Sequence, residues 1–532
     1  MTADLFGTAT VHAPVGMVAS VDHLASSAGV AILRTGGTAA DAAVAAGAVL
    51  AVTTQHQCGM GGDLFALVHR PGEPPAALCA AGRSGSGVDP VLLRAEGHER
   101  VPRWGDVRAV TVPGCVDGWI ALHRRYGRLP LAEVLEPAVT YAAAGFPATP
   151  ELAWAANFIL DLPGADDYRE PAMVAGGRLA AGTIIRRPGV AAALAAVATR
   201  GRAGFYLDTF GRGLLDVGNG LFAPADLTRD QAEWVMPLRV RAWGHDVWAP
   251  PPPSQGYLTL AGSWVADHLD LPDDPADPGW PHLLAEAARQ VGHDRPAVLH
   301  EGAFGEALVA EGRLAERLAA IDPQRRGDLA PVAAAGDTTA LCVVDGERTG
   351  VSLIQSNASG WGAGIVEPGT GIFLQDRALG FTLEAGHPAE YLPGRRPPHT
   401  LAPALVTTPD GRLRTVAGSM GGDAQPQFLL QLLARTLRHG QDPGTALAAG
   451  RWTLDAGGFR MWEGGGPGRV IVEAHAPEAW DVGLRDRGHE VERRTAAVDL
   501  AFGQAQIISV NADGVLDAAA DARAATSAAT GY

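Results

Sequence analysis

The sequence predicts a globular α+β protein, and three observations support this prediction. The chain has 532 residues, of which 47% are apolar and 19% charged, so it can bury a large core and lacks the composition of a disordered chain. Alanine-rich segments with helical periodicity occur early in the chain. Apolar runs joined by turn signals, which are typical of β-hairpins, occur near the N-terminus and again after residue 337. The length also exceeds that of one ordinary domain.

The predicted helices are concentrated in the N-terminal third of the chain. Residues 20–52 form an alanine-rich stretch that is interrupted at Gly36 and Gly37. Thr38 then stands where it can cap a second helix. Helical periodicity returns over residues 129–160. Small-residue helices of this kind pack closely, so we expect them in the core.

A strand pair is predicted between these helical regions. The apolar runs 64–68 and 76–81 are separated by a proline turn, and the second run exits at Arg83. Among its small neighbours, Arg83 could hold a substrate carboxylate with two hydrogen bonds. Taken alone, this residue is better interpreted as part of a surface salt bridge.

The middle of the chain holds two irregular segments followed by a well-marked hairpin. The proline-rich segment 250–256 is predicted to be a linker or a site loop, and 322–336 an exposed, flexible tether. The character then changes abruptly, because the apolar runs 338–344 and 351–355 flank a turn signal at 345–346. Two parts of the chain therefore meet at residue 337.

Charge and residue usage exclude several classes of function. The formal net charge is −16, and every one of the 42 cations is arginine. Without lysine there is no Walker A loop, Schiff-base lysine, pyridoxal phosphate anchor or Ser-Lys hydrolase. The acidic balance also disfavours nucleic-acid binding. Because Cys58, Cys79, Cys115 and Cys342 form no C-x-x-C pair, we expect reduced, buried thiols.

Motif searches predict neither a metal nor a cofactor, and no membrane segment. The chain holds no H-E-x-x-H motif, no G-x-S-x-G elbow and no spaced His/Asp ligand set. The first twenty residues lack a basic region followed by an apolar one, and the longest apolar stretch, 42–52, is too short to span a bilayer. We therefore expect a cytoplasmic protein.

Thr338 is the first candidate for chemistry. A threonine that opens a buried strand directly after a tether is the arrangement that an N-terminal nucleophile hydrolase needs. Cleavage between Asp337 and Thr338 would free an α-amine with a pKa of about 8, which suits a base acting on the adjacent hydroxyl. The alternative is that Thr338 merely begins a strand, and spacing alone favours that alternative.

A glycine pair supplies a candidate oxyanion site. Gly421 and Gly422 precede a predicted helix over residues 426–439. Backbone N–H groups near a helix start lack helical partners, so this segment could hold an oxyanion. An ordinary glycine-rich turn explains it equally well.

Further polar residues are predicted to lie near the start of the second hairpin. Gln355, Ser356 and Asn357 end its second strand, within reach of the first strand's start, although they could be simple turn residues. His399 and Thr400 follow two prolines and could donate hydrogen bonds to a carboxylate. A histidine in such a place is otherwise often solvent-facing.

Taken together and in order, these segments resemble the γ-glutamyltranspeptidase family of N-terminal nucleophile hydrolases, over nearly the whole chain. The matching segments are residues 20–62, 112–119, 252–256, 336–339, 352–364, 396–400, 418–422, 451–452, 521–523 and 530–532. So many ordered matches outweigh the separate alternatives given above for Thr338, Arg83 and the glycine pair.

The resemblance implies a fold and an assembly. It implies a four-layer αββα sandwich built from two chains that are cut from one precursor. Residues 1–337 would form the large subunit, and residues 338–532 the small subunit, beginning with the nucleophile. The two would form a heterodimer, and pairing of heterodimers into a heterotetramer is a further expectation.

The resemblance also implies residue roles. Thr338 matches the nucleophile, and Arg83 matches the arginine that holds the substrate α-carboxylate. His399 and Thr400 fall where a hydroxyl pair usually assists that arginine. Gly421 and Gly422 match the residues of the oxyanion hole.

Two departures from the family pattern affect the expected substrate. Gly380 stands where transpeptidases carry an aspartate that binds the glutamyl amino group, and Asp376 and Asp423 are the residues that could replace that charge. His399 replaces one hydroxyl, and the segment 355–357 replaces the usual Thr-x-Asn. This pattern is similar to that of members acting on oxamate-type amides, or removing an oxalyl or 2-oxo acid unit by carbon–carbon cleavage in secondary-metabolite pathways.

The sequence therefore predicts an autoprocessing threonine hydrolase or acyltransferase. Its expected substrate is a small amide or acyl compound that bears a carboxylate and is not a standard γ-glutamyl donor. Two alternatives stay open: a carbon–carbon bond hydrolase of the oxalyl-removing kind, and an unprocessed, non-catalytic homologue that binds a carboxylate.

Overall fold

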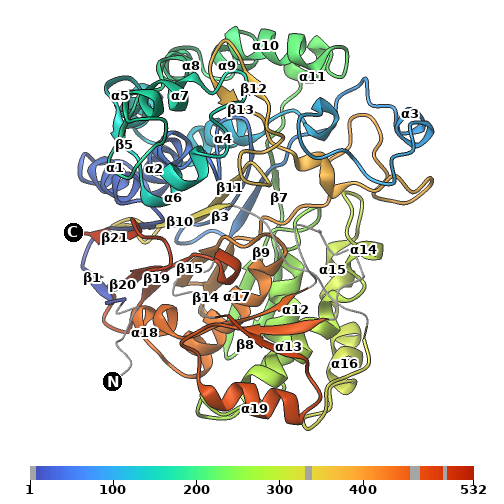
Figure 1. The fold of residues 1–532 in the computed structure, drawn as a ribbon. Coiled ribbons are helices and arrows are strands. Elements are labelled where there is room, and N and C mark those ends of the chain that lie inside the picture. Colours follow the sequence, from blue (N-terminus) through green and yellow to red (C-terminus); the bar gives the residue numbers. More distant parts are fainter. Residues whose placement is uncertain (1–7, 330–337, 456–467, 495–499) are drawn as a thin grey trace.

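The computed structural model describes residues 8–329, 338–455, 468–494 and 500–532. Two seven-stranded antiparallel sheets lie face to face, and helices cover the outer face of each sheet (Figure 1). The predicted α+β fold, a four-layer αββα sandwich, is confirmed.

The strand order of each sheet mixes early and late parts of the chain. One sheet runs β1 (Val11–Ala13), β20 (Leu516–Ala520), β19 (Ala505–Val510), β15 (Leu413–Ser419), β14 (Ala404–Thr407), β9 (His245–Ala249), β8 (Leu238–Ala242). The other runs β21 (Ala528–Gly531), β2 (Met17–Ser20), β10 (Thr339–Val344), β11 (Gly350–Ser356), β3 (Asp63–His69), β4 (Ala76–Ala80), β7 (Glu233–Val235). The hairpin β10–β11 thus lies between β2 and β3, so the parts before and after residue 337 are interleaved within one sheet.

The helices form the two outer layers. Those on the side of β10 and β11 are α1 (His23–Arg34), α2 (Ala39–Thr53), α4 (Cys115–Tyr126), α5 (Leu131–Ala144), α6 (Pro150–Ala156), α7 (Asp166–Val174), α8 (Pro188–Arg200), α9 (Ala203–Tyr206), α10 (Thr209–Gly218) and α11 (Pro224–Thr228). Those on the other side are α12 (Gly256–Asp267), α13 (Gly279–Gly292), α14 (Arg295–Val298), α15 (Gly305–Leu308), α16 (Glu311–Ala319), α17 (Gln425–Leu433), α18 (Pro443–Ala448) and α19 (Glu478–Asp486).

Shorter elements connect these layers. They are α3 (Pro90–Ala95), the pairs β5 (Phe146–Pro147) with β6 (Ile184–Ile185) and β12 (Val366–Glu367) with β13 (Ile372–Phe373), and the three-stranded sheet β16 (Trp452–Asp455), β17 (Arg469–Val472) and β18 (Val491–Arg493). Single 3₁₀ turns occupy Val107–Ala109, Arg377–Gly380, Gly422–Ala424 and Leu500–Phe502, and a π turn follows α17 at Ala434–Arg438.

The central strands are buried on both faces, which explains their continuous apolar runs. In β10, Leu341 and Val343 pack beneath the helices, whereas Cys342 and Val344 pack in the core between the two sheets. Successive side chains of a strand point to opposite faces, so one strand serves both cores. Odd-numbered positions of β10 therefore face the helices and even-numbered positions face the other sheet.

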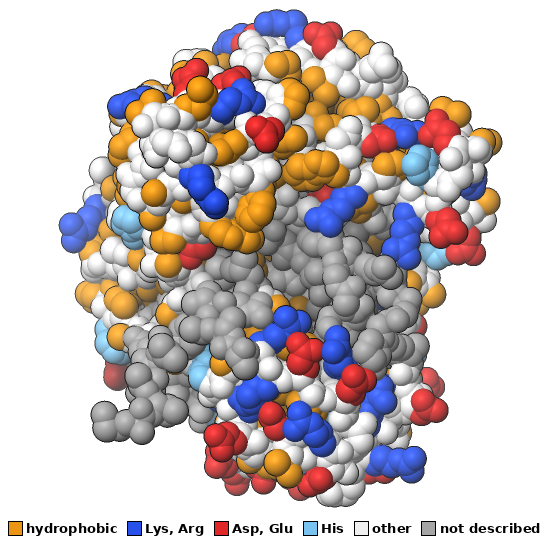
Figure 2. Space-filling view, in the orientation of Figure 1, with side chains coloured by type: hydrophobic (Ala, Val, Ile, Leu, Met, Phe, Trp, Pro, Cys, Tyr) orange, Lys and Arg blue, Asp and Glu red, His pale blue; other side chains and the backbone are white. Residues whose placement is uncertain are grey.

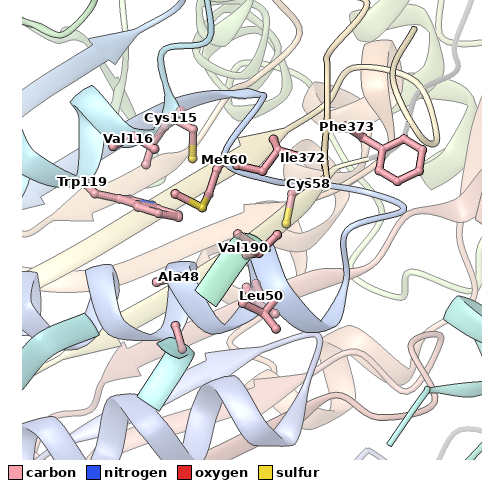
Figure 3. Close-up of a cluster of buried hydrophobic side chains, with 14 of the residues drawn as sticks. Ala48, Leu50, Cys58, Met60, Cys115, Val116, Trp119, Val190, Ile372 and Phe373 are labelled. Carbon is pink, nitrogen blue, oxygen red and sulfur yellow. The ribbon is translucent and has the colours of Figure 1, made fainter. Parts of the chain in front are cut away.

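The helix-side core contains two of the cysteines. Figure 3 shows Cys58, Met60, Cys115 and Trp119 packed among the side chains of α2 and α4. All four cysteines of the chain are buried and unpaired, as predicted.

The predicted local signals mostly match the structure. Thr38 caps α2, and Asp41 completes a capping box by accepting from the Thr38 N–H. The segment 129–160 is divided into α5 and α6, because Gly145 adopts a φ of 105° at the end of α5 and the chain turns there.

The segment expected to be a tether, 322–336, is only partly covered, since residues 330–336 lie outside the described residues. Its described part is exposed or half-buried but is held against α13. Arg289 donates to the carbonyl oxygens of Gly327 and Leu329, and Glu286 accepts from the Gly327 N–H. This stretch is therefore anchored as far as residue 329.

On the face seen in Figure 2, arginines are interspersed with Asp and Glu over the lower part of the molecule and form no continuous basic stripe. Within the described ranges, no helix combines the length and apolar character needed to cross a membrane.

Candidate active site

Thr338 and Ser356 lie side by side at the open end of the β10–β11 hairpin, on the face directed toward the second sheet. Their positions follow from strand periodicity, since Ser352 on the same face of β11 donates across the sheets to the carbonyl oxygen of Ala417, 2.7 Å away. The Thr338 hydroxyl donates to Ser356 Oγ at 3.2 Å. Thr338 is 1% exposed, so its hydroxyl lies in a pre-formed, buried environment.

Arg377 extends this pair into a network. Its Nη2 donates to Ser356 Oγ at 3.2 Å, and its Nη1 donates to Thr400 Oγ1 at 3.0 Å. The guanidinium is 1% exposed, and burial lowers its pKa from the usual value. Arg377 thus places Thr400 in the same cluster as Thr338, whereas the resemblance pairs Thr400 with Arg83.

Asp63 anchors the other side of the site at the start of β3. It is the register partner of Ser356, and its Oδ1 accepts from the Gly82 N–H at 2.9 Å and the Gly114 N–H at 3.1 Å. Its Oδ2 lies 3.1 Å from His399 Nε2. This carboxylate therefore fixes the two turns that flank it as well as the histidine.

His399 is buried and neutral, not solvent-facing. Burial, and then the nearby charge of Arg377, lower its pKa to about 3. Its Nδ1 accepts from the Leu401 N–H at 3.3 Å, which assigns the proton to Nε2 and the donor role toward Asp63. His399 holds the site together and does not titrate near neutral pH.

The glycine pair lies beyond the end of β15, in the turn before α17. Gly421 has a φ of 130° and Gly422 one of 53°, values that favour glycine. Neither of their N–H groups donates to another described residue. Both N–H groups are therefore free of partners among the described residues, which is a requirement of the predicted oxyanion role.

Gln255 connects this turn to the rest of the site. Its Nε2 donates to the carbonyl oxygen of Thr400 at 2.8 Å and to that of Gly422 at 2.9 Å. The predicted proline-rich segment 250–256 is therefore a buried site loop and not a linker between domains.

Two predicted residues point away from this cluster. Gln355 faces the helices, where its amide donates to the Gly47 carbonyl oxygen and accepts from Trp119. Asn357 donates to the carbonyl oxygen of Gln55 at 3.0 Å and fixes the loop after β11. Alternation along β11 explains why Ser356 reaches Thr338 and Gln355 does not.

Arg83 has an internal partner. Its Nη1 donates to Glu301 at 2.5 Å and to the carbonyl oxygen of Gly394 at 3.0 Å. Glu301 also accepts from the Arg396 N–H. Burial, and then the charge of Arg396, lower the pKa of Arg83. A substrate carboxylate at Arg83 would therefore compete with Glu301.

A pocket of about 310 Å³ opens next to the cluster. Gly380 and Phe381 line it, close in sequence to Arg377, as do Pro398, directly before His399, and Arg295. Asp376 and Asp423, the residues that could replace the amino-binding aspartate, are not part of its lining. The Asp376 carboxylate accepts from the Ser359 N–H, and the Asp423 carboxylate lies 3.4 Å from Arg295.

Sequence reasoning missed four residues of this site: Asp63, Gln255, Arg295 and Arg377. Alternation along β3 was a usable signal for Asp63, because Phe65 and Leu67 face the second sheet and Asp63 shares their parity. Arg295 and Arg377 each begin a single short helical turn, and Gln255 lies in the loop before α12. None of these is long enough for periodicity to show which way the side chain points. In the described ranges, no group of three or more His, Cys, Asp or Glu residues is arranged to hold a metal ion.

The four-layer fold, with a threonine opening a central strand, defines the chain as an N-terminal nucleophile hydrolase. Residues 25–531 match the family Gamma-glutamyltranspeptidase, and the chain belongs to this family. It is accordingly an enzyme of the hydrolase and acyltransferase type.

Three similar proteins illustrate the range of the family. The chain is 34% identical to the oxamate amidohydrolase proenzyme of Klebsiella pneumoniae over 97% of this chain and 98% of that protein. It is 33% identical to the glutathione hydrolase-like YwrD proenzyme of Bacillus subtilis over 95% and 97%. The crystal structure of cephalosporin acylase from Bacillus halodurans matches with a TM-score of 0.88 at 31% identity, covering 98% of this chain and 97% of that one.

Proposed function

We propose that the chain is a proenzyme that cuts itself before Thr338 and then uses Thr338 to hydrolyse a small amide or acyl compound bearing a carboxylate. The observation that carries the proposal is the buried Thr338 hydroxyl, 3.2 Å from Ser356 Oγ. Thr338 directly precedes β10, a strand of the sheet that both parts of the chain build. The proenzyme names of the two curated relatives above support the cut. The subunits would be residues 1–337 and 338–532, held together by the sheet that both build.

The proposed reaction needs only groups of this chain and water. After the cut, the Thr338 α-amine takes the hydroxyl proton while Oγ1 forms a bond to the substrate carbonyl carbon. The carbonyl electron pair moves onto oxygen, where the N–H groups of Gly421 and Gly422 hold it. Collapse breaks the bond to the leaving amine, which takes the proton from the α-ammonium. Water then attacks the ester in the same way and restores Thr338.

Gly380, which stands where a transpeptidase would carry an aspartate, supports a substrate other than a γ-glutamyl donor. The carboxylates that do line the pocket, Glu99 and Glu384, are exposed to solvent. A buried ammonium without a carboxylate partner carries a desolvation cost that neutral hydrogen bonds offset only in part. Asp376 and Asp423 are turned to Ser359 and Arg295, so neither is placed to receive that ammonium. The oxamate amidohydrolase and acylase names of similar proteins fit this choice.

Two alternatives to this proposal differ from it in the product that is released or in whether the chain is cut. A carbon–carbon bond hydrolase in secondary metabolism would release an oxalyl or 2-oxo acid unit through the same nucleophile. A non-catalytic homologue would bind a carboxylate and stay uncut. A cytoplasmic location and a heterotetramer are further proposals, which fractionation and native mass measurement test.

Intact mass spectrometry of the purified protein tests the central proposal. We expect two chains, the smaller beginning at Thr338, and turnover of oxamate or an N-aryl oxamate. Thr338→Ala should abolish both cutting and turnover, whereas Thr338→Ser should keep part of each. Thr339→Ser is the matched control, because the Thr339 hydroxyl lies 3.4 Å from the Gln355 carbonyl oxygen, away from the site. An active, uncut chain would refute the proposal.

A further inference from the structure

We propose that Arg377 binds the carboxylate of the substrate, and that this carboxylate is bonded directly to the scissile carbonyl, as in an oxalyl group. The inference rests on the proposed function, since it uses Thr338 as the nucleophile. The substrate carboxylate would then contact Arg377 and not Arg83, the arginine that the sequence predicts for this role.

Arg377 is a buried cation without a direct anionic partner. Four described arginines are less than 2% exposed, namely Arg187, Arg289, Arg377 and Arg523. The other three each have a carboxylate oxygen within 3.5 Å. Among the described residues, no carboxylate lies within 4.0 Å of the Arg377 guanidinium nitrogens, and its Nε has no hydrogen-bond partner. Burying such a charge is costly unless an anion meets it.

The nearby carboxylates are engaged elsewhere. Asp63 accepts from two backbone N–H groups, from Gln375 and from His399. Asp376 accepts from the N–H and the hydroxyl of Ser359. Asp423 faces Arg295. None of the three makes a direct ion pair with Arg377.

The hydrogen bonds of Arg377 leave donor capacity for a ligand. Its guanidinium has five N–H groups, and among the described residues these donate to only two neutral hydroxyls, Ser356 Oγ and Thr400 Oγ1. Ser356 Oγ already accepts from the Ala358 N–H at 2.8 Å and from Thr338. A hydroxyl oxygen has two lone pairs, so three donors exceed its capacity. An incoming carboxylate would accept from Arg377 and relieve this competition.

The position of Arg377 sets the length of the acyl group. Its Nη2 is separated from Thr338 Oγ1 by two successive hydrogen bonds of 3.2 Å through Ser356. A carbonyl carbon in position for attack lies about 3 to 3.5 Å from the nucleophile. A carboxylate on the adjacent carbon stays close enough to bond Arg377. The carboxylate of an extended glutaryl or glutamyl chain, three carbons further along, would be carried past it.

Arg83 would take the longer acids instead. Its partners are Glu301 and the Gly394 carbonyl oxygen, and neither Thr338 nor Ser356 is among its hydrogen-bond partners. The two arginines would therefore select acyl groups of different length. Arg377→Gln and Arg83→Gln are matched variants, because each removes one guanidinium and leaves the other.

Three p-nitroanilides differing only in the acyl group test the inference: oxalyl, with the adjacent carboxylate; glutaryl, with a distant carboxylate; and acetyl, with none. We expect Arg377→Gln to lower kcat/KM for the oxalyl compound ten- to a hundredfold and to change the other two less than about threefold. Arg377→Lys should recover part of the loss. Arg83→Gln should lower only the glutaryl value. Intact mass checks that each variant is cut.

An equal loss on all three anilides would show that Arg377 acts on structure or on the oxyanion and would overturn the inference. A selective loss of activity on the oxalyl compound in Arg83→Gln would show that Arg83, and not Arg377, binds the oxalyl carboxylate. If the wild type turns over none of the anilides, the proposed function fails, and calorimetry with oxalate decides the inference separately. The inference is supported if oxalate binds the wild type and Arg83→Gln and binds Arg377→Gln at least tenfold more weakly. It is refuted if oxalate binds Arg377→Gln as tightly as the wild type, or does not bind the wild type.

Discussion

Gln255 holds two segments of the site with one side-chain amide, and its replacement should slow the reaction selectively. Both Nε2 hydrogens are used, one on the carbonyl oxygen of Thr400 at 2.8 Å and one on that of Gly422 at 2.9 Å. Gln255→Met keeps the length of the side chain and removes both donors. The two carbonyl oxygens would then be buried without this partner.

The expected magnitude follows from these two bonds. Leaving a buried acceptor unsatisfied costs about 1 to 3 kcal/mol, and this applies to the Thr400 carbonyl oxygen. The Gly422 carbonyl oxygen still accepts from the Gln425 N–H, so it loses one ordinary hydrogen bond of about 0.5 to 1.5 kcal/mol, and the total is about 1.5 to 4.5 kcal/mol before relaxation. Part of this cost should be relieved by movement of the turn that carries the Gly421 and Gly422 N–H groups. In the proposed reaction these donors hold the developing oxyanion, so such a shift should lower kcat by about ten- to a hundredfold.

The assay compares kcat, KM and the melting temperature for wild type, Gln255→Met and the exposed control Gln324→Met. We expect a lower melting temperature and a lower kcat with KM nearly unchanged for Gln255→Met, and wild-type values for the control. A variant with wild-type kcat, or a loss confined to KM, would refute the positioning role.

Three other predictions follow from the site and the core. Gly421→Ala should lower kcat about a hundredfold, because the added Cβ would lie 2.6 Å from the Phe428 ring and the backbone φ there is 130°. The control is Gly411→Ala, where φ is 85° and no atom lies within 4 Å of the added Cβ, so it should lose only a little stability. Glu301→Gln should raise kcat/KM for glutaryl-p-nitroanilide about two- to fivefold, because it removes the carboxylate that competes for Arg83. The control variant Glu306→Gln should keep the wild-type kcat/KM. A lower kcat/KM in Glu301→Gln would show instead that Glu301 orients Arg83. Burial lowers the pKa of His56 to about 4, below the value of about 6.5 in the unfolded chain, so unfolding takes up a proton between these pH values. The free energy of unfolding should therefore fall as the pH drops from about 6.5 toward 4, by at most about 1.4 kcal/mol per pH unit. His56→Phe should flatten this slope in thermal melts and His268→Gln should not; equal slopes in both variants would contradict the assignment.

The sequence by itself determined the local elements whose signals lie within a few residues. Caps, turns and periodicity located α1, α2 and the hairpins β3–β4 and β10–β11. Ordered motifs then identified the family and the candidate nucleophile Thr338, because such motifs are contiguous and keep their spacing.

The tertiary structure alone decided which distant side chains meet. Arg377, Gln255 and Asp63 come from a 3₁₀ turn, a loop and the start of a strand, and only the packing of two sheets brings them to the end of β10. It also decided that Arg83 is held by Glu301, 218 positions away in the chain. Hydrogen bonds and charges act over a few ångströms in space regardless of sequence separation, so local pattern cannot report them.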